Sequence, residues 1–117
     1  MPSELRILRF RLDEAEAAIR MLAPRIGMVI PDGAFNSANN DPSVETPSTV
    51  FSQNNGENQI RVTNGKLAAS LIYLCRQNGV ELPDEGTKEI YVSSGFVELR
   101  MVLRHQAEQG MAARISA

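Results

Sequence analysis

The chain has 117 residues, the length of one ordinary domain, and 43% of them are hydrophobic, which is close to the value for globular proteins. Its 12 basic and 14 acidic residues give a formal net charge of −2, so the chain lacks the overall basic excess that is typical of proteins binding duplex DNA. With one cysteine, Cys75, and one histidine, His105, neither an internal disulfide nor a structural zinc site with four Cys or His ligands is available.

The first residues lack the apolar stretch of a secretory signal. No apolar run approaches the roughly 20 residues that are needed to span a bilayer. We therefore expect a cytoplasmic protein without a transmembrane segment.

Residues 3–23 carry the clearest helical pattern in the chain. Apolar residues recur there at spacings of three and four, as in an amphipathic helix: Leu5, Leu8, Leu12, Ala15, Ile19 and Leu22. Ser3 is a suitable N-cap, and Pro24 ends the helix. The stripe extends over three heptads, so it would lie on the domain's own core or form a helix–helix dimer seam, and we take its six residues as the candidate interaction surface.

A second interpretation of the same region stays open, because apolar and basic residues also alternate within it: Leu8, Phe10 and Leu12 with Arg9 and Arg11. In that case residues 5–12 form a strand, and Asp13 caps a shorter helix with Glu16 completing a capping-box-like pattern.

Residues 31–58 have a different composition, rich in the Pro, Gly, Asn, Asp, Ser and Thr residues that favour turns and loops. This composition predicts a polar loop or linker. Near its end, residues 49–52 and 59–62 predict a β-hairpin, because the Asn-Gly pair between them readily adopts the positive φ angles of tight turns.

Residues 66–78 predict a second helix, with Leu67, Leu71 and Leu74 on one face. Thr63 or Asn64 can cap its start, and Gly79 suits the left-handed residue that follows a helix. Its apolar arc is wide, so we expect this helix to be the most buried element and Cys75 to be a buried thiol without catalytic use.

Residues 89–92 and 96–103 alternate in polarity around the turn at 93–95 and predict a C-terminal β-hairpin. The competing interpretation is a helix over 95–109 that Ser94 caps. The tail from Arg104 onward is expected to be helical or frayed.

Together these elements predict an α+β fold, a small single domain with an N-terminal amphipathic helix, a central helix and a C-terminal β-hairpin. The alternative is a mostly α fold with a C-terminal helix over 95–109. We divide the chain into an N-terminal helical segment at 1–30, the polar loop or linker at 31–58, and a compact α+β core at 59–117.

Motifs for chemistry are missing from the sequence. It has no glycine-rich phosphate loop and no nucleophile elbow, and any Ser–His–Asp system would depend on His105. The acidic pairs at 13–14 and 84–85 and the nearby Glu16 are expected to lie on solvated faces. Potential oxygen ligands lack the spacing of a calcium loop: Asp32, Asn36, Asn39, Asn40 and Asp41. We expect no catalytic residue, no cofactor and no metal.

The sequence thus favours a non-enzymatic protein-interaction or assembly module that binds another protein, or itself, through the helix 3–23. One alternative is a small ligand-binding protein or hydrolase whose site is formed by the 31–58 loop. A second alternative is a DNA-binding regulator. Arg6, Arg9 and Arg11 could contact phosphates in that case, and an anionic membrane surface is a separate possible partner for them. Acidic residues directly downstream oppose both contacts, so we expect neither a nucleic acid nor a membrane surface as partner.

Overall fold

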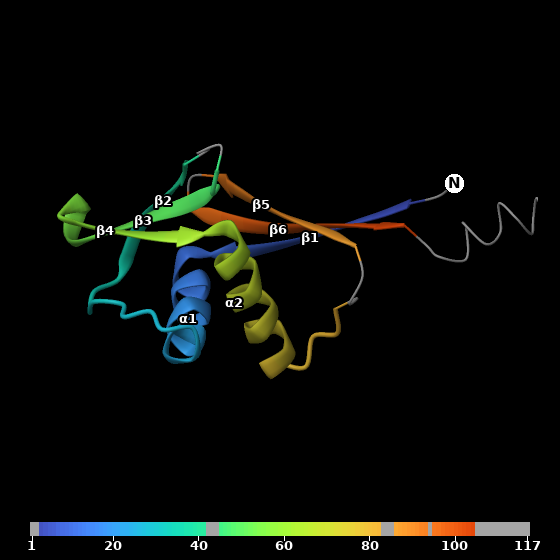
Figure 1. The fold of residues 1–117 in the computed structure, drawn as a ribbon, viewed down its shortest axis with the longest axis horizontal. Helices are drawn as coiled ribbons and strands as arrows, with labels where there is room; N and C mark the ends of the chain where they lie inside the picture. Colours follow the sequence, from blue (N-terminus) through green and yellow to red (C-terminus); the bar gives the residue numbers. More distant parts are fainter. Residues whose placement is uncertain (1–2, 42–44, 83–85, 94, 105–117) are drawn as a thin grey trace, which may run out of the picture.

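Two three-stranded antiparallel sheets and two α-helices make up the fold in the computed structural model, which describes residues 3–41, 45–82, 86–93 and 95–104 (Figure 1). Sheet A has the strand order β1-β6-β5, and sheet B has the order β2-β3-β4. The elements in chain order are β1 (Ser3–Arg11), α1 (Leu12–Leu22), β2 (Phe35–Asp41), β3 (Ser48–Gln53), β4 (Asn58–Thr63), α2 (Asn64–Gln77), β5 (Thr87–Ser93) and β6 (Phe96–Arg104). The fold class expected from the sequence is therefore wrong, because the chain is rich in sheet and begins with a strand.

The predicted helix over 3–23 is in fact a strand followed by a shorter helix. β1 pairs with β6 along its whole length, from Ser3 opposite Arg104 to Arg11 opposite Phe96. α1 then begins at Leu12, where the Glu14 carboxylate accepts a hydrogen bond from the Arg11 backbone N–H at 2.9 Å and caps the first turn. The open alternative of a strand and a shorter helix is confirmed in its order of elements, but its capping residues are wrong, because Arg11 and Glu14 cap the helix instead of Asp13 and Glu16. The apolar stripe did not distinguish a helix from a strand, because the spacing of Leu5, Leu8 and Leu12 fits the helical period and in part the strand period. Pairing with a distant strand decides between the two structures.

The segment 31–58, expected to be a polar loop or linker, contains the strands β2 and β3. Its polar side chains are held by specific hydrogen bonds, so they do not prevent regular structure: the buried Thr49 donates to Asn64 Oδ1 at 3.0 Å. The predicted hairpin is present as β3 and β4, with Phe51 opposite Ile60. Its turn places Asn54 and Asn55 at φ angles of 50° and 56°, as the sequence indicated.

α2 matches the second predicted helix closely. Thr63 is its N-cap and accepts a hydrogen bond from the Lys66 N–H at 3.3 Å. Leu67 and Leu71 are fully buried, and Gly79 follows the helix at a φ of 76°.

The predicted C-terminal hairpin is present as β5 and β6, with Ile90 opposite Leu99 and Val92 opposite Val97. The competing helix over 95–109 is wrong as far as Arg104, because β6 lies between β1 and β5 and pairs with both. The remainder of that range lies outside the described residues.

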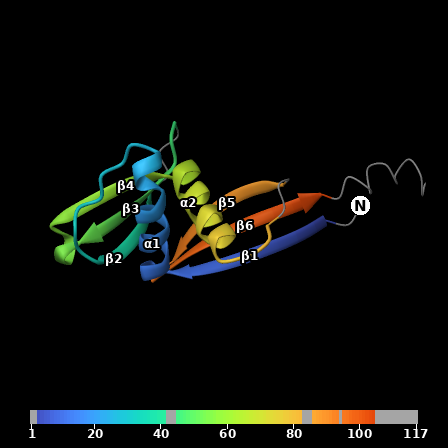
Figure 2. The ribbon, with the colours of Figure 1, turned by 90° about the horizontal axis from the view of Figure 1, so that it is seen from below.

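α1 and α2 pack against each other on one side of the sheets (Figure 2). Sheet A thus has an inner face that packs towards the helices and an outer face that points away from them. The largest fully buried apolar side chains of this core are Ile19, Phe51, Val62, Leu67, Leu71, Val97, Leu99 and Met101. No helix in the described ranges combines the length and the apolar composition that crossing a membrane requires.

The connection between α1 and β2 is tied down by two polar side chains. Arg20 on α1 donates to the carbonyl oxygens of Pro31 at 2.9 Å and Gly33 at 3.0 Å. The buried Gln53 donates to the same two oxygens, each at 2.8 Å. Glu16 pairs with Arg20 at 2.9 Å, so this carboxylate fixes the fold rather than lying on a freely solvated face.

Candidate functional site

The six residues expected to form an interaction surface do not share one surface. Leu5 is exposed on the outer face of sheet A, and Leu8 lies half-buried on the inner face. The other members lie along α1, where Leu12 is half-buried and Ala15, Ile19 and Leu22 are buried in the core of their own domain. The structure therefore brings only Leu5 of the six to an exposed position next to other apolar side chains.

Exposed apolar and charged side chains meet on the outer face of sheet A. The pairing registers of β1, β5 and β6 place these residues on it: Leu5, Ile7, Arg9, Tyr91, Phe96, Glu98 and Arg100. Leu5 is 57% exposed and Ile7 is 46% exposed, and both lie on β1. The face is thus open to solvent although it carries large apolar groups.

Glu98 on the central strand organises the charges of this face. Arg9 donates to one of its carboxylate oxygens at 2.8 Å, and Arg100 donates to the other at 3.0 Å. The Glu98 side chain is only 10% exposed beneath them. The hydrogen bonds from Arg9 and then Arg100 lower the pKa of Glu98 below its ordinary value, so the carboxylate stays ionised.

Aromatic rings extend this arrangement. The Arg9 guanidinium lies 5.3 Å from the centroid of the Phe96 ring, and that of Arg100 lies 3.8 Å from the centroid of the Tyr91 ring. Both arginines are therefore held between a carboxylate and an aromatic ring. They form a preorganised polar rim beside Leu5 and Ile7.

β1 also presents a free strand edge. β6 is its only strand partner among the described residues, and the register between them has no bulge over nine residues. Figure 2 shows β1 along one long side of sheet A with no other element beyond it. The described parts of the two sheets have three further edge strands, β2, β4 and β5; that of β2 is bulged, since its register shifts between Phe35 and Ser37, and such a bulge hinders further pairing. The backbone N–H and C=O groups on the free side of β1 are thus available to another strand.

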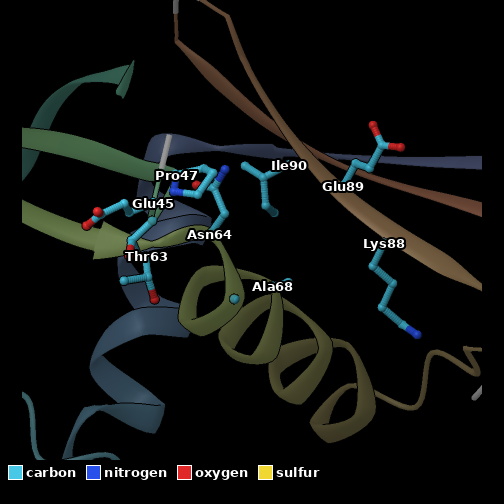
Figure 3. A pocket seen from close by; sticks show the side chains of 10 residues that line it. Glu45, Pro47, Thr63, Asn64, Ala68, Lys88, Glu89 and Ile90 are labelled. Atoms are coloured by element: carbon cyan, nitrogen blue, oxygen red, sulfur yellow. The ribbon is translucent and has the colours of Figure 1, made fainter. Parts of the chain in front are cut away.

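A hollow of about 680 Å³ among the described residues is a competing site (Figure 3). It lies between the start of α2 and β5, and it is lined by Glu45, Thr46, Pro47, Thr63, Asn64, Gly65, Ala68, Lys88, Glu89 and Ile90. At the start of the helix, Asn64 already has partners, because its backbone N–H donates to the Pro47 carbonyl oxygen and its Oδ1 accepts from Thr49. Figure 3 shows Lys88 and Glu89 pointing in different directions from β5, so these two charges do not converge on one ligand position.

The residues considered for chemistry are dispersed in the part of the chain that the structure describes. No group of three or more His, Cys, Asp or Glu side chains could hold a metal there. Cys75 is buried, and burial raises the pKa of its thiol, which disfavours the reactive thiolate. His105 and the acidic pair at 84–85 lie outside the described residues.

The candidate oxygen ligands of residues 32–41 are spread along a strand instead of converging in a loop. Asn36, Asn39 and Asn40 are exposed on β2, and Asp41 forms an ion pair with Arg61 across the sheet. Asp32 is exposed in the connection before β2.

The basic trio near the start is divided between the two faces of β1. Arg6 lies on the inner face, while Arg9 and Arg11 lie on the outer face, where they pair with Glu98 and Asp13. The Arg11 hydrogen bond lowers the pKa of Asp13, so this pair stays charged at neutral pH. A continuous basic strip of the kind that contacts a phosphate backbone does not form here, which weakens the DNA-binding alternative.

The chain matches no protein-family model, and neither a curated protein nor a solved structure is significantly similar to it.

Proposed function

We propose that this chain is a non-enzymatic protein-interaction module that binds its partner along the free edge of β1 and the adjoining outer face of sheet A. The observation that carries the proposal is the exposure of Leu5 and Ile7 beside a nine-residue strand edge that pairs with no other strand in the described ranges. An edge of this kind binds an extended segment by adding it to the sheet, with backbone hydrogen bonds giving affinity and side chains giving specificity.

The side chains around the edge support this mode of binding. Leu5 and Ile7 would lose their contact with water on binding, at a gain of about 25 cal/mol for each Å² of apolar surface that is covered. Arg9 and Arg100 are already held by Glu98, and Arg100 also contacts the Tyr91 ring, so ordering these side chains costs little further entropy. Arginine and tyrosine are also among the residue types that dominate binding energy at protein interfaces.

The test compares the proteins retained from an extract of the cells that make this chain by three immobilised forms: the intact chain, Ile7→Lys and Val29→Lys. Val29 is 90% exposed in the connection between α1 and β2, so its variant adds the same charge at another exposed apolar position. We expect a partner that the intact chain and the Val29 variant retain and the Ile7 variant loses. Circular dichroism of the three forms checks that each is folded. If the folded Ile7 variant keeps every partner of the intact chain, β1 is not the binding edge.

A second candidate function is the binding of a small ligand in the hollow of Figure 3, whose volume lies within the range of known ligand pockets. A thermal-shift screen of the intact chain and of Ala68→Leu, which would narrow the hollow, tests this candidate. A compound that stabilises the intact chain but not the variant supports it, and equal shifts contradict it.

A further inference from the structure

Two oppositely charged side chains lie next to each other at the free edge of β1. Glu4 and Arg6 are two residues apart and therefore lie on the same face of the strand, the inner one. Glu4 is exposed and has no hydrogen bond or ion pair with any residue that the structure describes. Arg6 makes one solvent-exposed contact, a hydrogen bond of 3.4 Å to the carbonyl oxygen of Glu81. Both charges are thus accessible to a strand that adds to this edge.

The spacing of these charges is self-complementary. When two copies of one edge strand pair antiparallel about a twofold axis, the residue on the axis faces itself, and its two neighbours face each other. An axis at Leu5 therefore places Glu4 of each copy opposite Arg6 of the other and forms two ion pairs. An axis at Glu4 or at Arg6 would place like charges opposite each other, and an axis at Ile7 would place Glu4 opposite Phe10.

The same register also brings the exposed apolar side chains together. On the outer face, Leu5 faces Leu5 of the second copy, and Ile7 lies diagonally across from that leucine, within reach of its side chain. Four apolar side chains that are exposed in one copy would thus form a continuous cluster across the axis. The ion pairs on the inner face and the burial of apolar side chains on the outer face therefore favour the same alignment of the two strands.

We propose that a second copy of this chain pairs with β1, antiparallel and with Leu5 on the twofold axis, so that two copies of sheet A form one six-stranded sheet. This inference rests on the proposed function, because it takes β1 as the protein-binding edge and names the partner. Arg6 would exchange its weak contact with Glu81 for a carboxylate of the second copy.

Sedimentation velocity over a concentration series tests the pairing by exchange of the two charges. The variants of the full chain are Glu4→Arg, Arg6→Glu and the double variant with both substitutions. Each single variant places like charges opposite each other at both pairs, so we expect its dimer to dissociate about tenfold or more readily than that of the intact chain. The double variant restores opposite charges and should dimerise like the intact chain. An equimolar mixture of the two single variants should form a mixed dimer, because one variant then presents two positive charges to the two negative charges of the other.

The control variant is Glu57→Arg, which makes the same charge change in the turn between β3 and β4 and should dimerise like the intact chain. An intact chain that stays monomeric up to about 1 mM overturns the proposal, and so does a dimer that both single variants retain. If the intact chain is monomeric but the Ile7→Lys variant still loses a captured partner, the second copy is excluded as partner while the proposed function holds. If neither self-association nor capture depends on β1, both fail.

Discussion

Replacing Leu71 with Ala should destabilise the fold severely, because this side chain lies in the middle of α2 and is 0% exposed. The substitution removes three carbon atoms, worth about 2.4 kcal/mol at roughly 0.8 kcal/mol for each buried CH₂ group. The cavity left between α2 and the sheets adds to this loss, so the total should fall at about 3–4 kcal/mol, within the usual range of 2–5 kcal/mol. A domain of this size has a free energy of unfolding of only about 5–15 kcal/mol.

Urea unfolding and thermal melts of Leu71→Ala, with Leu5→Ala as the matched control, measure this loss. At roughly 3–6 °C for each kcal/mol, the melting temperature of Leu71→Ala should drop by about 10–20 °C. Leu5→Ala removes the same atoms from a side chain that is 57% exposed, so it should cost less than about 1 kcal/mol at a concentration low enough to prevent self-association. A neutral Leu71→Ala together with an unfolded Leu5→Ala would refute this assignment of the core.

Three further outcomes follow from single contacts. Removing the carboxylate with Glu98→Gln should lower the melting temperature at pH 7. Because the folded-state pKa of Glu98 is lowered, the stabilisation that the carboxylate gives is present above about pH 4.3 and is lost as the pH falls through the folded-state pKa. The melting temperatures of the variant and the intact chain should therefore converge in acid. The control Glu57→Gln should show no such convergence. Thr63→Ala should lower the free energy of unfolding in urea by about 0.5–2 kcal/mol, because it removes the N-cap of α2. Thr63→Ser keeps a hydroxyl at this position and should lose much less. Equal losses in the two variants would exclude capping as the cause. Cys75 should react with a thiol reagent about tenfold or more slowly in buffer than in urea, and equal rates would show that the thiol is not buried.

The parts of the fold that the sequence predicts are those that short-range signals determine. α2 has its cap at Thr63, its apolar face and its terminating Gly79 within 17 consecutive residues. The turn between β3 and β4 is likewise encoded by adjacent asparagines and a glycine. In both places the local preference and the final structure agree, so the sequence alone is sufficient.

β1 shows why the remainder could not be predicted. Its residues carry both a helical and a strand pattern, and the strand forms because β6, far along the chain, supplies the hydrogen-bonding partner. The polar β2 becomes a strand for a similar reason, since β3 pairs with it from Asp41 to Phe35.

The candidate site depends on long-range contacts in the same way. Arg9 and Glu98 are 89 positions apart, and their ion pair exists only in the observed register of β1 and β6. The alternation of Leu5, Ile7 and Arg9 on one face is visible in the sequence once a strand is assumed. Whether that face lies towards the core or towards solvent depends on which side of the sheet the helices cover. No local sequence pattern predicts that side.

The position of β1 and β6 as neighbours has a consequence for how the chain acquires its structure during synthesis. The ribosome makes Ser3 first and Arg104 101 residues later, which at about 5–20 residues per second is a delay of roughly 5–20 s. Sheet B and both helices are complete before the central strand of sheet A emerges. Throughout that interval β1 has two unpaired edges instead of one, and a neighbouring nascent chain on the same messenger would present an identical strand.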